Sequence, residues 1–339
     1  MMYGAGDLRL DEEGLAAVPG PSEVLVQTEF TGFSTGTDLG NFEGRSTEVP
    51  GAPPYPRAVG YSNVGIVAAV GGAVRRFRVG DRVFAVRPHV SAYLAGEDDL
   101  LIRVPDGAAA EQAALAYLIH LGVASLRQAR MQPGETVAVV GLGVIGLCAV
   151  AAARAMGARV IAVANSQRRA KLALQVGASD ALLSGTFHAP DVFGGAGADV
   201  VVLTANPWAA WRESMELAAP HGRVAVLGFP GRAQEAPSFN PLDAVWLYGK
   251  QLTIFGAGHV PRVECAPGDV RFNLRRSLEY VLELLASGAM NVGAVISHRI
   301  PWSQMRSAYE MAARHDKELS AAVFDWRLEV ADDGLQGRT

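Results

Sequence analysis

Three glycines near the middle of the chain have the spacing that binds the pyrophosphate of a dinucleotide. The segment VAVVGLGVIG places Gly141, Gly143 and Gly146 between an apolar run and a helix-forming run. In such a motif the first glycine permits a tight turn, the second lets the backbone approach a phosphate, and the third lets the helix pack close to the strand. The first helical amides, of Val144 and Ile145, then face the phosphates. The alternative is a glycine-rich packing turn that holds no ligand.

The residues that follow the next apolar run, Arg159–Ala164, indicate which dinucleotide is bound. They are Asn165, Ser166, Arg168 and Arg169, and no acid stands among them. NAD sites tend to hold the ribose 2′-hydroxyl with an acid at this place, whereas arginine grips a 2′-phosphate with two hydrogen bonds. Cations are disfavoured at a helix N-terminus, so two there suggest a purpose. The pattern predicts NADP(H), the alternative being two solvated arginines.

Two further residues at strand ends belong to the predicted cofactor site. Thr204 follows the apolar run Asp199–Leu203, and Gly228 ends the run Arg223–Gly228. Ligands of open α/β sheets bind beyond the carboxyl ends of the strands. We therefore expect both residues to line the cofactor cleft.

The elements that must position these residues change in type along the chain. The first 120 or so residues hold short alternating runs such as Ser22–Thr28 between Gly/Pro turns, typical of an irregular barrel or sandwich. A helical pattern then runs over 108–131, and apolar strands alternate with helices as far as Phe255. This alternation predicts an α/β fold with a doubly wound parallel sheet. A long amphipathic helix is expected over Phe272–Ala286.

Composition excludes several classes of protein. The 339 residues suggest two domains, and the net charge of −4 with no basic stripe disfavours nucleic acid or an anionic membrane as a partner. The N-terminus has no apolar core typical of a signal peptide, and the longest apolar stretch is broken by glycines. The two cysteines, Cys148 and Cys265, make a disulfide framework unexpected. We expect a cytoplasmic protein with a small-molecule substrate.

Several local patterns resemble the medium-chain dehydrogenase/reductase family. FSTGTD at 33–38 is similar to its I-C-G-T-D, VGYSNVGIV at 59–67 to its G-H-E-x-x-G-x-V, and VGDRV, PHGRVAVLG and KQLTIFGAG also match. The resemblance covers about Ser22 to Trp326. It implies a GroES-like barrel domain over 1–123 and 269–330, a Rossmann domain over 124–268, and a flexible tail over 331–339. It also implies a homodimer or homotetramer, with the strand near Leu252–Phe255 and its flanks as the interface.

This chain departs from the zinc-dependent branch of that family at the metal. The cysteine of I-C-G-T-D is replaced by Thr35, the histidine of G-H-E by Tyr61 and its glutamate by Ser62. The third ligand position falls at Ala113, and a four-cysteine structural site is excluded by the cysteine count. Zinc requires thiolate, imidazole or carboxylate ligands, so we predict no metal. The pattern resembles a zinc-independent subgroup that includes relatives of bacteriochlorophyllide dehydrogenase and natural-product alcohol dehydrogenases.

Without zinc, hydrogen-bond donors must stabilise the oxyanion and a side chain must move the proton. The candidates are Thr35, Thr37 and Tyr61 at the former metal positions, and His89 and His120 as proton carriers. Each has a structural alternative: a turn residue for the threonines, a packed aromatic ring for Tyr61, and a satisfied core residue for the histidines. By resemblance, the acid Asp38 is more often structural.

These patterns predict an oxidoreductase that transfers a hydride between NADP(H) and a ketone or secondary alcohol, with secondary metabolism as one expected setting. Reduction of an activated C=C bond, as in zinc-free quinone reductases of the same fold, stays an alternative. So does a non-catalytic NADP(H)-binding protein.

Overall fold

The computed structural model describes residues 1–15, 18–45, 53–187, 192–193, 195–258, 260 and 273–328. The tail expected at 331–339, the domain boundary expected at 268/269 and Cys265 lie outside these residues. The chain forms two compact units, one of residues 1–117 and 296–339 and one of residues 118–295. None of the helices in the described part is long and apolar enough to cross a membrane.

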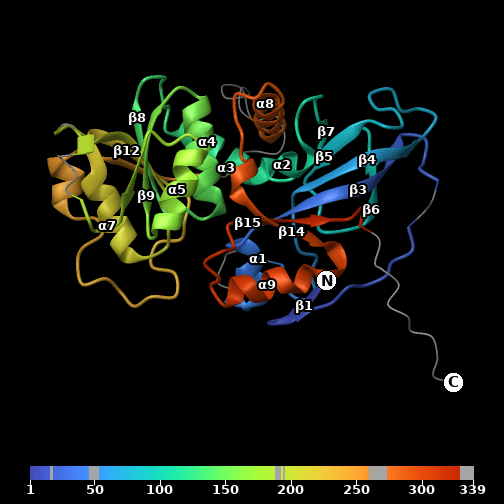
Figure 1. Cartoon of the computed structure of the whole chain (residues 1–339), viewed down its shortest axis with the longest axis horizontal. Coiled ribbons are helices and arrows are strands. Elements are labelled where there is room, and N and C mark those ends of the chain that lie inside the picture. Colours follow the sequence, from blue (N-terminus) through green and yellow to red (C-terminus); the bar gives the residue numbers. More distant parts are fainter. Residues whose placement is uncertain are drawn as a thin grey trace. The chain divides into compact units, whose positions relative to one another are not determined.

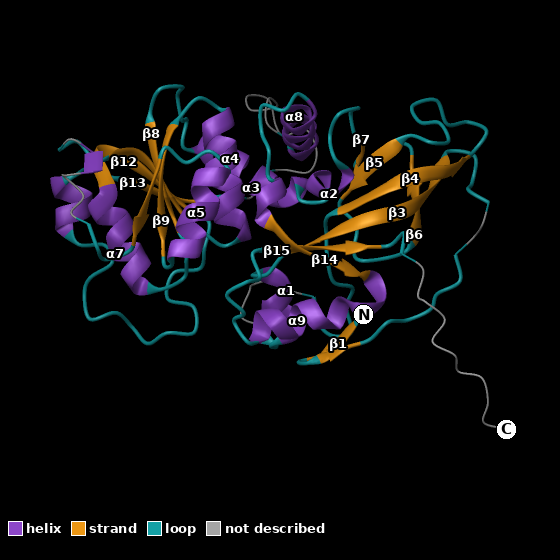
Figure 2. Ribbon diagram, in the orientation of Figure 1, coloured by secondary structure: helices purple, strands orange, loops and turns teal. Residues whose placement is uncertain are grey.

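The unit formed by residues 118–295 is built on a fully parallel six-stranded sheet (Figures 1 and 2). Its strand order is β10-β9-β8-β11-β12-β13. The strands are β8 (Thr136–Val140), β9 (Arg159–Ala164), β10 (Asp180–Leu183), β11 (Ala198–Leu203), β12 (Ala218–Val226) and β13 (Thr253–Gly256). The helices are α3 (Ala116–Gln128), which begins in the other unit, α4 (Val144–Ala155), α5 (Gln167–Gln175), α7 (Trp208–Leu217), α8 (Leu274–Ala286), and the short turns η2 (Val245–Gly249) and η4 (Gly293–Val295).

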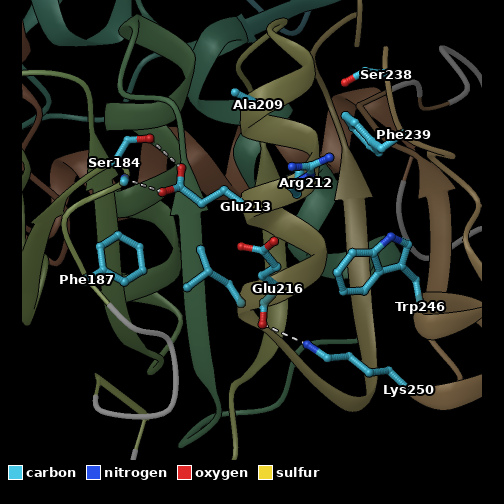
Figure 3. A pocket seen from close by; sticks show the side chains of 12 residues that line it. Ser184, Phe187, Ala209, Arg212, Glu213, Glu216, Ser238, Phe239, Trp246 and Lys250 are labelled. Carbon is cyan, nitrogen blue, oxygen red and sulfur yellow. Dashed lines mark hydrogen bonds between the residues drawn. The ribbon is translucent and has the colours of Figure 1, made fainter.

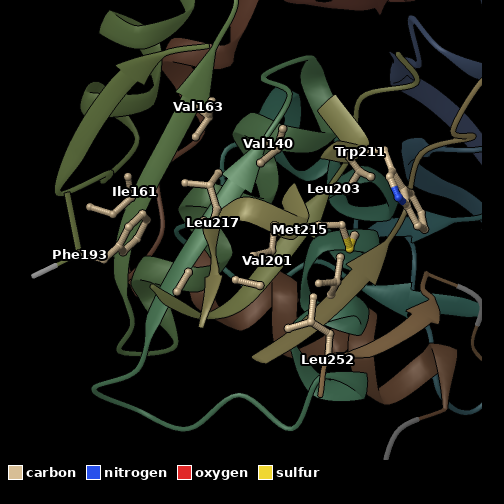
Figure 4. Close-up of a cluster of buried hydrophobic side chains, with 14 residues drawn as sticks. Val140, Ile161, Val163, Phe193, Val201, Leu203, Trp211, Met215, Leu217 and Leu252 are labelled. Atoms are coloured by element: carbon tan, nitrogen blue, oxygen red, sulfur yellow. The ribbon is translucent and has the colours of Figure 1, made fainter. Parts of the chain in front are cut away.

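Helices cover both faces of this sheet, with α4 and α5 on one face and α7 on the other (Figure 1). The central strands β8, β9 and β11 are mostly apolar because both faces of the sheet are buried there. In the core between the sheet and α7, Val201 and Leu203 of β11 pack with Met215 and Leu217 of α7 and with Leu252 (Figure 4). The doubly wound α/β fold expected from the alternating pattern is confirmed.

The unit formed by residues 1–117 and 296–328 is a mainly antiparallel β-structure. Its main sheet has the order β14-β15-β3-β4-β5-β7, with β6 also pairing with β3. The strands are β1 (Met2–Gly4), β2 (Asp7–Leu8), β3 (Glu23–Phe33), β4 (Asn63–Val70), β5 (Arg82–Ala85), β6 (Ala92–Gly96), β7 (Leu101–Arg103), β14 (Ile296–Pro301) and β15 (Ala321–Asp325). The helices are α1 (Thr37–Phe42), α2 (Ala110–Ala113), α9 (Met305–Ala313) and the turn η5 (Trp302–Gln304).

The long helix expected over 108–131 is divided into α2 and α3. The division has a tertiary cause. The Ala114 carbonyl accepts a hydrogen bond from Ser62 Oγ at 2.6 Å, and a Cβ on Gly32 of β3 would lie 2.3 Å from the same oxygen. Side-chain periodicity alone does not reveal such a contact with a distant strand.

Candidate active site

The predicted cofactor motif lies at the point where the parallel sheet changes direction. From β8 the chain continues into α4 on one face, while the adjacent β11 continues toward α7 on the other (Figure 1). Such a switch point, at the carboxyl ends of the strands, is where open α/β sheets bind ligands. Gly141 begins the turn with a φ of +91°, and a Cβ there would lie 2.8 Å from the Ala205 amide nitrogen. Glycine is required there on both counts.

Gly143 and Gly146 differ in what surrounds them. A Cβ on Gly146 would lie 1.9 Å from the Gly141 carbonyl oxygen, so this glycine permits the turn and α4 to pack closely. Around Gly143 there is open space instead, and this residue caps α4 without a side-chain hydrogen bond. The first amides of α4, from Val144 and Ile145, follow this open space. The arrangement fits a dinucleotide pyrophosphate.

Thr204 and Gly228 lie beside the turn. The Thr204 hydroxyl donates to the Gly141 carbonyl at 2.7 Å, so it fixes the turn. Gly228 packs on the backbone after β11, since a Cβ there would lie 2.9 Å from the Thr204 carbonyl oxygen. Both residues hold the walls of the cleft together. Their direct contact with a cofactor stays a prediction.

The segment expected to select the 2′-phosphate follows β9. Asn165 is exposed, and Ser166 caps α5 by accepting a hydrogen bond from the Arg169 amide at 3.4 Å. Arg168 and Arg169 are half-buried in the first turn of α5, which contains no acid. Two cations therefore gather at the carboxyl end of β9, where a phosphate would offset the unfavourable helix dipole.

In the other unit, the FSTGTD segment forms a buried polar cluster. Asp38, in the first turn of α1, is fully buried, and its Oδ2 accepts a hydrogen bond from the Ser34 amide at 2.9 Å. Burial raises the pKa of the Asp38 carboxyl group to about 7, against the lowering effect of the Ser34 and Gly60 amides. Tyr309 of α9, also fully buried, lies beside this carboxyl group; burial and the charge of Asp38 both raise the pKa of its phenol.

Tyr61 lies closer to the surface than Tyr309. Its side chain is partly exposed, and its ring meets that of Tyr117 edge-on at a centroid distance of 5.0 Å. Burial and then the charge of Asp38 raise the pKa of the Tyr61 phenol, while the hydroxyl groups of Ser34 and Thr37 act in the opposite direction. The phenol therefore stays protonated at neutral pH.

The two threonines of this segment are placed near its surface. Thr37 is exposed at the start of α1, and Thr35 is partly exposed. The structure thus gathers Thr37 and Tyr61 around the Ser34 and Asp38 cluster. The catalytic roles of Thr35, Thr37 and Tyr61 stay predictions.

The two candidate histidines are both buried. His89 packs its ring on Gly60, where a Cβ would lie 2.5 Å from the ring, and meets Phe324 edge-on at 4.9 Å. Burial lowers the pKa of His89 to about 3. In α3, burial and then the nearby charge of Arg127 lower the pKa of His120 to about 4. Both imidazoles are therefore neutral near pH 7, which makes them weaker candidates for protonated acids than Asp38.

The unit formed by residues 118–295 also has a hollow of about 650 Å³ beside α7 (Figure 3). Glu213 of α7 accepts hydrogen bonds there from the Ser184 hydroxyl at 2.9 Å and the Gly185 amide at 3.1 Å. Lys250 donates to three backbone carbonyls at the end of α7, among them that of Glu216. None of the residues predicted from the sequence to form the site lines this hollow.

Known proteins with this organisation are alcohol dehydrogenases and their relatives. Residues 20–121 match the "Alcohol dehydrogenase GroES-like domain" family, and residues 144–265 match the "Zinc-binding dehydrogenase" family. Together these matches take in both units. The chain belongs to the medium-chain dehydrogenase/reductase superfamily.

Individual relatives in the superfamily are distant in sequence. Sorbitol dehydrogenase of Bacillus subtilis is 26% identical over 333 residues, covering 87% of this chain and 88% of that protein. A solved galactitol-1-phosphate dehydrogenase from Escherichia coli has a TM-score of 0.78 at 21% identity, over 95% of this chain and 97% of that one. A putative zinc-binding dehydrogenase from Sinorhizobium meliloti, solved bound to NADP, has a TM-score of 0.75 at 23% identity, over 96% of this chain and 97% of that one.

The superfamily's zinc does not fit the residues of this chain. Thr35, Tyr61 and Ala113 stand at the ligand positions expected from the resemblance. None of them supplies the thiolate, imidazole or carboxylate of a zinc site. Within the described residues, moreover, no three His, Cys, Asp or Glu side chains are grouped to hold a metal ion. We therefore derive no step through zinc.

Two members of the polar cluster were missed as functional candidates. Asp38 could have been singled out from the sequence as an acid within a run of small hydroxyl residues. Tyr309 could not, because it reaches Asp38 only through the packing of α9 on α1.

Proposed function

We propose that this chain is an NADP(H)-dependent oxidoreductase that interconverts a ketone and a secondary alcohol without a catalytic zinc ion. The observation that carries the proposal is the three-glycine turn at the switch point of the parallel sheet, with the uncapped start of α4 and the open space at Gly143 beside it. The names of the relatives, sorbitol dehydrogenase, probable D-xylulose reductase A and galactitol-1-phosphate dehydrogenase, support a polyol or related substrate.

A bound nicotinamide would supply or accept the hydride. The residues of this chain would bind and orient it: Gly141, Gly143 and Gly146 would admit the pyrophosphate to the amides of α4, and Arg168 and Arg169 would hold the 2′-phosphate. Arginine beside the phosphate, with no acid in the first turn of α5, supports NADP(H) over NAD(H). In the other unit, the phenol of Tyr61 donates a hydrogen bond to the substrate oxygen and then its proton.

The proposal is tested by titrating the purified protein with NADPH and NADH while metal content is measured on the same sample. We expect at least a tenfold preference for NADPH, ~1.4 kcal/mol, no stoichiometric zinc, and turnover of ketones. The double variant Arg168→Ala/Arg169→Ala should lose the preference and still bind NADH. A preference for NADH, or activity that needs added zinc, would contradict the proposal. A profile restricted to activated alkenes would replace ketone reduction by C=C reduction.

We also propose that the chain forms a homodimer through the edge of the parallel sheet. β13 is the last strand of that sheet, and the preceding segment exposes Leu242, Val245, Leu247 and Tyr248, the last of them 85% exposed. Apolar side chains beside an unpaired strand edge favour association. Light scattering after size exclusion should give twice the chain mass, and Tyr248→Glu should shift it toward the monomer. A wild-type monomer would contradict the proposal.

A further inference from the structure

The cluster around Asp38 holds buried polar atoms that the fold leaves unsatisfied. Among the described residues, Ser34 Oγ, Asp38 Oδ1 and the Tyr309 hydroxyl are inaccessible and make no hydrogen bond of ordinary distance and angle. The Tyr309 hydroxyl nevertheless lies close enough to Asp38 to lower the pKa of its carboxyl group. Folded proteins keep few such atoms because each costs about 1–3 kcal/mol. Three of them in one cluster, one on a fully buried acid, call for a functional explanation.

The cluster is connected to the surface through Tyr61. The Ser34 amide donates a hydrogen bond to Asp38, and the Ser34 hydroxyl acts to lower the pKa of the Tyr61 phenol. Tyr61 is itself partly exposed, and Thr37 beside it is exposed. The charge of the fully buried Asp38 therefore acts on a phenol that is itself partly exposed, at the position where the substrate oxygen is expected.

We propose that Asp38 is a positioning residue that stores a proton for Tyr61, delivering it after each carbonyl reduction and recovering it in alcohol oxidation. This inference rests on the proposed function. In reduction, the hydride that a bound nicotinamide would supply adds to the carbonyl carbon, the C–O π pair moves to the oxygen, and the oxygen gains the Tyr61 proton. The resulting phenolate takes the proton of the Asp38 carboxyl group, and solvent then reprotonates the Asp38 carboxylate.

The acidities of the two groups suit this order of transfer. The pKa of Asp38 is about 7, and that of Tyr61 is raised above its ordinary 10.0. Transfer from the carboxyl group to the phenolate is therefore favourable, and a group with a pKa near the working pH is readily recharged by water. A carboxyl group of ordinary pKa would already have lost its proton at neutral pH and could not act as a general acid.

The groups that face Asp38 lower its pKa too little to offset the effect of burial, so the pKa stays at about 7. They are the amides of Ser34 and Gly60, the phenol of Tyr309 from α9, and, through its charge interaction, Tyr61. His89, which packs on Gly60, is neutral at this pH. No cation of the described residues contributes to the pKa of Asp38.

The test compares kcat for ketone reduction with saturating NADPH across pH in the wild type, Asp38→Asn and Asp325→Asn. Asp325 is a matched control, since it is a nearly buried acid of the same unit whose pKa is lowered, with Arg327 as its partner. We expect the wild-type kcat to fall as pH rises through about 7. Asp38→Asn should lose this inflection and roughly tenfold or more in kcat, with KM little changed. Asp325→Asn should keep it. A wild-type profile in Asp38→Asn would overturn the proposal.

Tyr309→Phe provides a second test should Asp38→Asn fail to fold. Because the Tyr309 hydroxyl lowers the pKa of Asp38, its removal should move the inflection to higher pH. An unmoved inflection would contradict the proposal. NMR titration of ¹³C-labelled aspartate measures the same carboxyl group without turnover. A buried carboxyl group titrating near 7, together with a response of the Tyr61 ring, supports the proposal even if no ketone is reduced, in which case only the proposed function fails. A carboxyl group that titrates near 3.8 would refute the proton store and leave the proposed function standing.

Discussion

Tyr61 differs from Tyr309 and Tyr93, whose phenols also have a raised pKa, because its side chain reaches the surface. Tyr309 and Tyr93 are buried, whereas Tyr61 is partly exposed beside exposed Thr37. Replacement by phenylalanine keeps the ring contact with Tyr117 and removes only the proton donor. We expect Tyr61→Phe to lower kcat for ketone reduction about 10²-fold or more, the usual contribution of general acid catalysis, with the NADPH affinity unchanged. Steady-state kinetics and fluorescence titration measure the two quantities.

Tyr93→Phe is the control, since the Tyr93 hydroxyl is also buried but belongs to a different apolar cluster, with Val24, Val67 and Val83. It should leave kcat within a factor of two or so, because it touches nothing in the proposed site. If Tyr61→Phe and Tyr93→Phe reduced activity equally, loss of packing would explain both, and Tyr61 would not be the proton donor.

The spatial neighbours of a residue could be predicted where they lie in recognisable motifs of the sequence. Thr37 and Tyr61 stand in two short motifs that the family resemblance places at one site, so their proximity was foreseeable. The pairing of Asp38 with Tyr309 was not, because it arises when the end of the chain returns to pack α9 against α1. The burial of His89 could not be predicted for the same reason, because Phe324, which packs against its ring, lies on β15.

At the scale of the elements, the turn from β8 into α4 depends on three glycines whose replacement by alanine should have different effects. Gly143 has open space around its Cα, and its φ of −68° suits any residue, so Gly143→Ala should fold normally. The new methyl group would occupy the space proposed for the pyrophosphate. We expect at least a tenfold loss of NADPH affinity, ~1.4 kcal/mol, with an unchanged melting temperature. Gly146→Ala should instead lower the melting temperature, because its Cβ would meet the Gly141 carbonyl at 1.9 Å.

Gly72→Ala is the control, since Gly72 lies in open space in the other unit and should change neither property. Full NADPH affinity in Gly143→Ala would mean that the cofactor does not approach this turn.

The elements themselves were predicted best where the pattern was local and long. β9 has the expected bounds, and α4, for which the pattern predicts a helix over Ile145–Met156, lies one residue earlier. β10 was missed because it has only four residues, Asp180–Leu183, too few to show a periodicity. β12 begins at Ala218, earlier than expected, since its first residues include a proline and a glycine that read as a turn.

At the scale of the whole molecule, three buried titratable groups make stability depend on pH in opposite directions. The pKa values of His89 and His120 are lowered from 6.5 to about 3 and about 4. Between pH 4 and 6.5 the unfolded chain therefore binds two protons at these sites that the folded chain does not, and the free energy of unfolding rises with pH. The pKa of Asp38 is raised from 3.8 to about 7, so the folded chain binds one proton more and stability falls as pH rises through this range.

These opposing effects predict an optimum of stability near pH 6.5 and a specific signature for Asp38. Below it, two histidine protons against one carboxyl proton leave a net gain of roughly 1.4 kcal/mol per pH unit. Above it, of these three groups, Asp38 alone still titrates, and its charge then lowers stability until about pH 7. In Asp38→Asn the free energy of unfolding should no longer fall above pH 6.5, and below pH 6.5 it should rise more steeply with pH. The stability of this variant relative to the wild type should therefore increase steadily from acid to neutral pH, by up to about 4 kcal/mol in total. Urea unfolding across pH measures the difference. A constant difference between the two proteins would mean that Asp38 is already charged in the fold, and the mechanism that gives it a stored proton would fail with it.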